Sequence, residues 1–571
     1  MIENYAKLEP RFQKAYDMLF KSFGLNEFKF KDAEKILEDY ANKKEVLSEL
    51  EKAGLLKVRP LEEDKRVKIY KLNPIEEKIK KPTKDQLIKI LKAGADLIRT
   101  RVDYRVLLVL LFYKAVSDKY FAIYKKYKSE GYPDEEAYLY ANYDLITLYD
   151  EKDGKLYTWQ EVIRAGSYSD FINALYKLVE LEGNEEKLKN FNNLIDKTGL
   201  ATLFNTENVH IIEKLLNLFG SFDFSNVSYD ILGDAYEWIL YYFAPDKAKE
   251  GEVYTPLEVS RLLAKIIDPS EEDIILDPAC GSGSMLIEQY LYVKNKIDEP
   301  FIQLYGQEAN DITAVLAELN FILHGIKDYE IYIGDSLINP KFPKAKKVVA
   351  NPPWNQDGYD EDTLKRNPNH KEIFEFGYTN KQSADWAWVQ LINYFAEEKA
   401  GIVLDSGALF RGGKEQNIRK GFLIKDIIEA VVLLPEKIFY NTQAPGILLI
   451  LNKNKPKERE GKVLFINASQ EYIQHPEIKK LNKLSDENIE KIAQAYREYK
   501  TIEGFSRAVD LKKIEENDYN LNVSLYVAPI EEEEQIDLEN EFKELENLHQ
   551  EYEEKYKLVK GYIEEINKLG V

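Results

Sequence analysis

One short stretch, DPACGSGS at residues 277–284, constrains the fold more than any other part of the sequence. An apolar run at residues 274–276 precedes it, and a second apolar run at residues 285–287 opens a helical pattern. A strand, a tight glycine turn and a helix in this order are typical of a nucleotide-type site at the edge of an α/β sheet. Gly281 and Gly283 let a ligand approach the backbone closely, and the start of the helix offers free N–H groups. The spacing is neither GxGxxG nor a P-loop, so the ligand class stays open on this evidence.

A second block, VVANPPW at residues 348–354, again carries an apolar strand into a loop. Its two prolines fix the backbone and lack N–H groups, so the loop is stiff and its carbonyls are free acceptors. Asn351 and the carbonyl of Pro352 can accept hydrogen bonds from a planar amino group, and Trp354 can stack on the ring that bears it. The alternative is a rigid proline turn beside a partly buried tryptophan.

DPACGSGS and NPPW, in this order, resemble the S-adenosylmethionine and catalytic motifs of amino-group DNA methyltransferases. The surrounding sequence is similar to the modification subunit of type I restriction-modification systems over roughly residues 90–530. The matching stretches are GEVYTP (251–256), YGQEAN (305–310), LHGI (323–326), GDSL (334–337), ADWAWVQ (384–390), LFRGGKEQNIRK (409–420), LPEKIFYNTQAP (434–445) and YNLNVSLYV (519–527). One departure is LDSG at residues 404–407, where relatives usually have leucine-proline.

The resemblance implies a Rossmann-like, S-adenosylmethionine-dependent methyltransferase domain that methylates N6 of a flipped adenine in duplex DNA. The residues themselves fit cytosine as well as adenine. The implied catalytic residues are Asn351, Pro352, Pro353 and Trp354. The implied cofactor-binding residues are Glu252, Val253, Tyr254, Thr255, Pro256, Asp277, Ala279, Cys280, Gly281, Ser282, Gly283, Ser284, Glu308, Asp335 and Ser336.

Some of these assignments have a reason in the residues. Glu308 ends the next strand downstream of the glycine turn, where a carboxylate can accept hydrogen bonds from both ribose hydroxyls. Asp335 follows a third strand and could accept from the adenine amino group of the cofactor. Thr255 and Pro256 are typical of a helix cap and a first-turn proline, so we predict a helix over residues 257–267.

Basic residues in two segments are candidates for contact with DNA. Arg411, Lys414 and Arg419 lie on a glycine turn and the helix after it, and we predict that they face DNA. Residues 355–378 are polar and rich in turn formers, which predicts a loop that orders on the base or on DNA. Its basic residues either meet phosphates or are simply solvated; they are Lys365, Arg366, His370 and Lys371. The five scattered histidines show no metal-ligand spacing, and we expect no metal.

The sequence divides into four parts. Residues 1–78 carry three helical patterns and two short strands, which predicts a winged helix that binds either nucleic acid or protein. Residues 84–245 predict a helical N-terminal domain, in which residues 106–113 are apolar all round and should be buried. Residues 246–475 form the expected catalytic domain. Residues 476–571 form a C-terminal region that ends in a long coiled-coil helix.

The C-terminal helix has an apolar seam at spacings of four and three residues, over about four heptads. The seam residues are Leu538, Phe542, Leu545, His549, Tyr552, Tyr556, Val559, Ile563 and Ile566. A heptad seam needs a partner helix, in this chain or in another. The resemblance implies that the partner is the specificity subunit.

The net charge of −21 indicates that another chain supplies many of the contacts with DNA, because binding to phosphates favours basic proteins. The expected partners are duplex DNA, a specificity subunit, a second modification subunit and a restriction subunit. One cysteine and the absence of a long apolar run predict a cytoplasmic protein that no membrane anchors. Two other functions stay open: a catalytically silent scaffold for a specificity subunit, and methylation of a protein glutamine.

Overall fold

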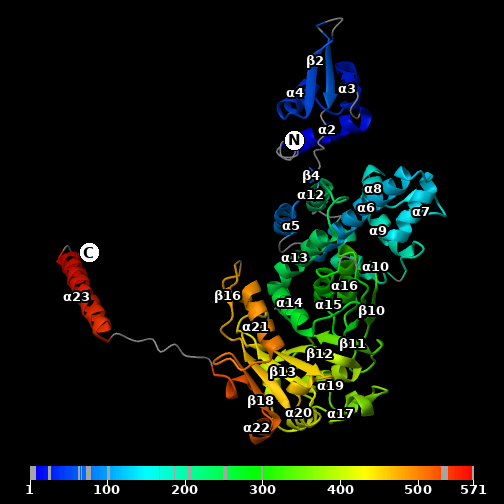
Figure 1. Ribbon diagram of the computed structural model, residues 1–571. Coiled ribbons are helices and arrows are strands. Elements are labelled where there is room, and N and C mark those ends of the chain that lie inside the picture. Colours follow the sequence, from blue (N-terminus) through cyan, green and yellow to red (C-terminus); the bar gives the residue numbers. More distant parts are fainter. Residues whose placement is uncertain are drawn as a thin grey trace.

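The computed structural model describes residues 8–23, 27–61, 65, 67–72, 79–80, 82–98, 103–165, 168–185, 187–203, 209–248, 254–297, 300–440, 442–476, 478–528 and 538–568. A small N-terminal unit has its own core, which includes Leu19 and Leu47. Its three helices and three-stranded antiparallel sheet, ordered β1-β3-β2, lie beyond one end of the main body (Figure 1). The elements are α2 (Pro10–Phe23), β1 (Glu27–Lys29), α3 (Phe30–Ile36), α4 (Lys43–Lys52), β2 (Leu56–Pro60) and β3 (Lys68–Leu72).

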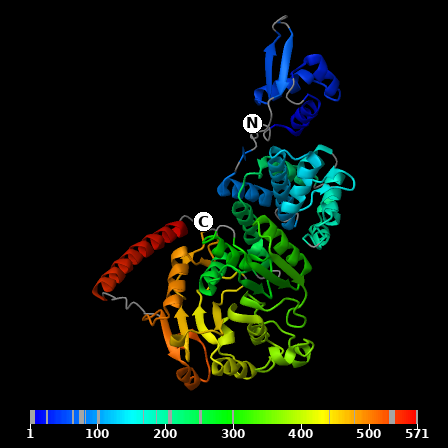
Figure 2. The same ribbon diagram turned by 45° about the vertical axis from the view of Figure 1, so that its right-hand side comes forward.

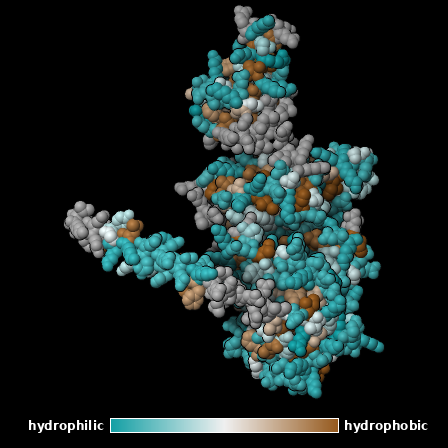
Figure 3. All heavy atoms as spheres, turned by 60° about the vertical axis from the view of Figure 1, so that its left-hand side comes forward, coloured by the Kyte–Doolittle hydropathy of each residue, from teal (hydrophilic) through white to brown (hydrophobic). Residues whose placement is uncertain are grey.

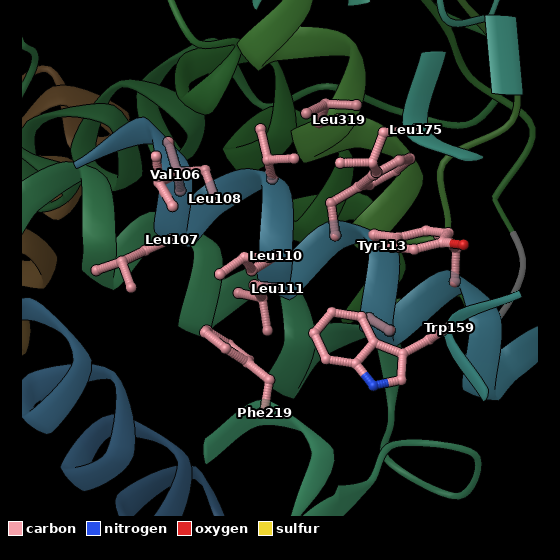
Figure 4. Packing of buried hydrophobic residues seen from close by; sticks show 14 of the residues in the cluster. Val106, Leu107, Leu108, Leu110, Leu111, Tyr113, Trp159, Leu175, Phe219 and Leu319 are labelled. Atoms are coloured by element: carbon pink, nitrogen blue, oxygen red, sulfur yellow. The ribbon is translucent and has the colours of Figure 1, made fainter. Parts of the chain in front are cut away.

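A helical region follows, and its core confirms the prediction for residues 106–113, because all eight side chains have no exposed surface. Figure 4 shows Val106, Leu110 and Tyr113 of α6 packed among neighbouring helices, with Leu319 coming from the sheet domain. The elements are β4 (Ile79–Lys80), α5 (Lys84–Ile98), α6 (Arg105–Ser129), α7 (Asp134–Asp144), β5 (Tyr149–Asp150), β6 (Lys155–Leu156), α8 (Trp159–Ala165), α9 (Tyr168–Glu180), α10 (Phe191–Thr198), α11 (Leu200–Leu203), α12 (Val209–Gly220), β7 (Phe222–Asp223) and α13 (Tyr229–Ala248).

Among the described residues, the sheet domain contains nine strands in the order β10-β9-β8-β11-β12-β14-β13-β15-β18. Strands β8 to β12 are parallel, whereas β14 is inserted antiparallel between β12 and β13. From β8 the chain continues to β9 on one side of that strand, and it later returns to the other side with β11, so a topological switch point lies at β8. The strands are β8 (Ile274–Asp277), β9 (Gln303–Glu308), β10 (Tyr329–Ile333), β11 (Ala345–Ala350), β12 (Ala396–Asp405), β13 (Ile428–Leu433), β14 (Gly446–Asn452), β15 (Lys462–Asn467) and β18 (Ser506–Asp510).

Helices cover both faces of this sheet, as the near-continuous apolar strands require. Helices α14 (Leu257–Ile267), α15 (Ser284–Lys294) and α21 (Asp486–Glu498) share one core with one face. Helices α19 (Asp385–Phe395), α20 (Lys414–Ile424) and α22 (Leu511–Glu516) share another core with the opposite face. Helix α16 (Asp311–Leu323) joins the sheet domain to the helical region, because Leu316 and Leu319 belong to the core of the helical region.

Two further predictions concern the segment at residues 355–378 and the C-terminal helix. Residues 355–378 are not one irregular loop, because they contain two one-turn helices, α17 (Glu361–Leu364) and α18 (His370–Ile373). The C-terminal helix α23 (Leu538–Lys568) exists as expected, and both ribbon views draw it apart from the main body (Figures 1 and 2). Its seam residues Phe542, Tyr552 and Ile563 are 64%, 61% and 53% exposed.

The surface of the main body is largely hydrophilic in the face that Figure 3 shows, with small apolar patches between polar ones. Among the described residues, no helix is both long enough and apolar enough to cross a lipid bilayer.

Candidate functional site

One cavity of about 330 Å³ lies at the carboxyl ends of β8, β9, β10 and β11, beside the switch point. Crevices at this position are where open α/β sheets bind their ligands. The cavity joins the glycine turn to the Asn-Pro-Pro corner, which lie on neighbouring strands. Its lining residues are Tyr241, Tyr254, Thr255, Asp277, Pro278, Ala279, Cys280, Gly281, Ser282, Ser284, Met285, Glu308, Ala309, Asn310, Thr313, Gly334, Asp335, Ser336, Asn351, Pro353, Gln356, Tyr359 and Trp388.

The glycine turn needs glycine at two positions. Gly281 has φ 55° and Gly283 has φ 80°, both in the left-handed region that side chains disfavour. Gly283 is the N-cap of α15, and a Cβ there would lie 3.0 Å from Cζ of Phe321. Ser284 and Met285, at the start of α15, line the cavity, so the free N–H groups of the first turn of this helix lie beside it.

Glu308 holds the turn from the next strand. Its Oε2 accepts from the N–H of Gly281 at 3.0 Å, and its Oε1 accepts from the N–H of Asn310 at 2.9 Å. Burial raises the pKa of the Glu308 carboxyl, against these backbone hydrogen bonds, which lower it. Burial also raises the pKa of Asp277 to about 8, and the nearby Glu308 adds to that rise. The floor of the cavity is therefore less negative at neutral pH than its two carboxyl groups suggest.

The residues after β10 are already engaged within the protein. Asp335 Oδ1 accepts from the N–H of Leu337 at 2.9 Å, and its Oδ2 accepts from the hydroxyl of Tyr359 at 2.7 Å. The hydroxyl of Ser336 donates to the carbonyl of Pro278 at 2.6 Å, which ties this loop to the glycine turn. A carboxylate oxygen has more than one lone pair, so Asp335 retains capacity to accept from a ligand.

Asn351 and Thr255 form the other wall. The Asn351 side chain is 9% exposed, and its Nδ2 donates to Oγ1 of Thr255 at 2.8 Å. The indole Nε1 of Trp354 donates to Oδ1 of Asn351 at 3.0 Å. The prediction that Thr255 caps the following helix is wrong, because α14 has Pro256 at its N-cap and no side-chain cap. The hydroxyl orients the Asn351 amide instead.

Trp354 lies just outside the cavity lining, and so do Pro352 and Pro256. The half-buried ring of Trp354 packs edge-on against Phe439, with the ring centres 4.7 Å apart and the ring planes at 68°. Glu252 and Val253 lie outside the described residues. The structure thus brings together most of the residues that were predicted from the two motifs.

The expectation that basic residues near α20 face DNA is wrong for Arg419. Its side chain is 1% exposed and donates to the backbone carbonyls of Ala408, Arg411 and Tyr519. Arg411 is only partly exposed and forms ion pairs with three carboxylates, those of Asp385, Asp405 and Glu415. Lys414 is exposed, and its contact with DNA stays a prediction.

Ten lining residues were not among those predicted from the motifs, and they include Tyr241, Gln356, Tyr359 and Trp388. Tyr241 comes from α13 of the helical region, and its hydroxyl donates to the carbonyl of Thr255 at 3.1 Å. Trp388 of α19 donates from Nε1 to Oε1 of Gln356 at 3.1 Å, and Tyr359 contacts Asp335 as above. Long-range packing brings Tyr241 and Trp388 to the cavity, although Trp388 lies within the matching stretch ADWAWVQ, whereas Gln356 and Tyr359 come from the segment directly after the Asn-Pro-Pro corner.

Known proteins resemble this chain at the levels of sequence and fold. Residues 227–535 match the family model described as N-6 DNA Methylase. The type I restriction enzyme MjaVIII methylase subunit of Methanocaldococcus jannaschii is 62% identical over 578 residues, which cover 98% of this chain and 99% of that protein. The MpnII methylase subunit of Mycoplasma pneumoniae is 32% identical over 65% of this chain and 71% of its own length.

Among solved structures, the type I restriction-modification methyltransferase subunit from Streptococcus thermophilus has a TM-score of 0.67 and 28% sequence identity. It covers 78% of this chain and 100% of its own. The family match spans more than half of the chain, and the first relative matches it almost from end to end. This chain therefore belongs to the N-6 DNA methylase family, among the methylase subunits of type I restriction enzymes.

Proposed function

We propose that this protein transfers a methyl group from S-adenosylmethionine to N6 of adenine in duplex DNA, within a complex that includes a specificity subunit. The observation that carries the proposal is the single cavity that joins the glycine turn to Asn351. A donor in one part of the cavity and an extruded base at the other end would face each other, as direct transfer between them requires.

The residues of the turn fit S-adenosylmethionine. When bound, it supplies an electrophilic methyl group on a sulfonium. The N–H groups at the start of α15 suit its carboxylate, since a helix N-terminus favours anions. Glu308 ends β9 at the place where ribose hydroxyls are held in folds of this type, and Asp335 can accept from the adenine amino group. Tyr359 and Trp388 offer aromatic surfaces to the adenine ring.

Asn351 would hold the target amino group. The Oδ1 of Asn351 accepts one hydrogen bond from Trp354 and keeps a second lone pair for the base. Together with the Pro352 carbonyl, it would orient the nitrogen lone pair towards the methyl group and stabilise the positive charge that develops on the nitrogen. The ring of Trp354 would lie against the base on the face away from Phe439. The proton can leave after transfer, so the reaction needs no strong base.

The N-terminal unit and the C-terminal helix would each contribute a binding surface to this function. We propose that residues 1–78 are a winged helix with α4 in the recognition position. The exposed residues of α4 have mixed charge, Lys44 and Lys52 against Glu45 and Glu51, which suits a protein partner as well as DNA. We propose that α23 pairs with helices of the specificity subunit through its exposed seam, because such a seam is stable only against a partner helix. A second modification subunit and a restriction subunit would complete the complex.

Transfer of radiolabelled methyl groups from S-adenosylmethionine tests the function against its alternatives. The chain should be co-expressed with its specificity subunit and incubated with DNA and with protein substrates. Label in DNA as N6-methyladenine, only when the specificity subunit is present, supports the proposal. Label in protein glutamine would indicate the related amide chemistry, and no transfer to either by a complex that still binds DNA would indicate a silent scaffold.

A further inference from the structure

Helix α13 of the helical region reaches the back of the glycine turn. Gly233 of α13 lies so close to α16 that a Cβ would come within 2.2 Å of the His324 ring. Three residues further on, the hydroxyl of Tyr236 donates to the carbonyl of Leu316 in α16 at 3.0 Å. Tyr241 then enters the cavity wall. One side of α13 therefore packs closely against α16, from the first turns of α13 to the edge of the cavity.

Glu237 occupies the middle of this contact. Its side chain is 3% exposed, and one carboxyl oxygen, Oε1, has no hydrogen-bond partner among the described residues. Burial, together with the nearby Glu288, raises the pKa of Glu237 to about 8, and the neighbouring side chains of Ser284 and Asn320 oppose this rise. The carboxyl group is thus neutral near pH 7 and provides one O–H donor as well as acceptors.

The neighbours of Glu237 belong to the glycine turn or hold it. Asn320 is fully buried, its Nδ2 donates to the carbonyl of Ser282 at 3.1 Å, and its Oδ1 has no partner among the described residues. The hydroxyls of Ser282 and Ser284 lie 3.2 Å apart. A neutral Glu237 would satisfy these two side chains, because its carboxyl group could donate to the unpaired Oδ1 of Asn320 and accept from the hydroxyl of Ser284.

We propose that Glu237 is a positioning residue for the cofactor site and that its buried carboxyl group holds Ser284 and Asn320 in place behind the glycine turn. The proposal rests on the proposed function, since the turn is taken to bind S-adenosylmethionine. It means that the helical region completes the donor site in addition to joining the sheet domain through its core. Ionised Glu237 would lose its donor to Asn320 and place a negative charge behind a site for an anionic carboxylate.

Calorimetric titration of the full chain with S-adenosylmethionine tests this role. At pH 7, Glu237→Gln should bind within about threefold of wild type, because an amide also offers a donor and an acceptor. Glu237→Ala should bind at least about tenfold more weakly, because it leaves Asn320 unsatisfied. Glu288→Gln is the matched control, since Glu288 is a buried acid of the same cluster that faces Arg261. At pH 7 it should keep the wild-type affinity, because burial, the largest cause of the raised pKa of Glu237, is unchanged in this variant.

The pH dependence separates a positioning role from a merely structural one. Between pH 7 and 9 wild type should lose affinity several-fold more than Glu237→Gln does. The other charged or titratable groups around Glu237 are Glu288, Asp234, Arg261 and Tyr241, and they are present in both proteins. This comparison does not depend on whether Glu237→Ala folds. Equal pH profiles, or wild-type affinity in Glu237→Ala, would overturn the inference. A wild-type chain that binds no donor at any pH would instead refute the proposed function.

Discussion

Thr255→Val is the sharpest test of how the target amide is held. The substitution keeps the shape of the side chain and removes the oxygen that accepts from Nδ2 of Asn351 at 2.8 Å. Because Asn351 is only 9% exposed, its N–H would then be buried without a partner. An unsatisfied buried donor costs about 1–3 kcal/mol, which corresponds to a rate loss of roughly 5-fold to 150-fold if the cost falls on the transition state.

The assay is steady-state methylation of a DNA duplex by the chain with its specificity subunit. The expected loss is in kcat, because the misoriented amide affects transfer more than binding of the donor. Thr255→Ser is the control, since it keeps the hydroxyl, and it should stay within about threefold of wild type. If Thr255→Val methylated DNA within twofold of wild type, the hydrogen bond from Asn351 to Thr255 would have no part in catalysis.

Three further predictions follow from other parts of the structure. Gly283→Ala should lower the melting temperature by several degrees, because it combines a strained φ of 80° with a contact at 3.0 Å between the new Cβ and Phe321. Gly281→Ala should lower the melting temperature less, since its Cβ would have open space around it, and equal shifts would contradict the packing argument. Burial lowers the pKa of His324 to about 4, so the stability that depends on the neutral ring is present above the ordinary pKa of about 6.5 and is lost as the pH falls towards 4. In an acid titration followed by circular dichroism, His324→Gln should lose less folded structure than wild type. An equal loss in both proteins would exclude this histidine as a cause of acid unfolding. A chain that ends at residue 528 should bind S-adenosylmethionine normally but fail to co-purify with the specificity subunit, whereas normal co-purification would exclude α23 as the docking helix.

The sequence predicts the sheet domain well because its signals are local. An apolar strand, a glycine turn and a helix start follow one another within residues 274–287, and the structure has β8, the turn and α15 there. The helix at residues 257–267 has the expected bounds for the same reason, and the apolar run of α6 is buried as expected. The strand β1 was missed because three residues carry too little periodicity to be distinguished from a loop.

The errors at the site arise from long-range contacts. Thr255 precedes a proline at a helix start, as a cap would, but its hydroxyl is used by Asn351, which lies 96 positions later in the chain. Arg419 is in a basic segment, as a phosphate ligand would be, but its buried guanidinium donates to three backbone carbonyls instead. Glu237 and Tyr241 gave no local signal, because their position behind the glycine turn depends on how α13 packs on α16.

The most direct test of the central claim compares Asn351→Ala with wild type in two measurements on the same preparation. Affinity for S-adenosylmethionine should change by less than about threefold, because the glycine turn and Glu308 are untouched. Formation of N6-methyladenine in DNA, measured by mass spectrometry, should fall by at least about 100-fold, since positioning and electrostatic stabilisation of the amino group are lost together. Methylation at the wild-type rate by Asn351→Ala would contradict the account, because the base would then be held somewhere other than at this corner.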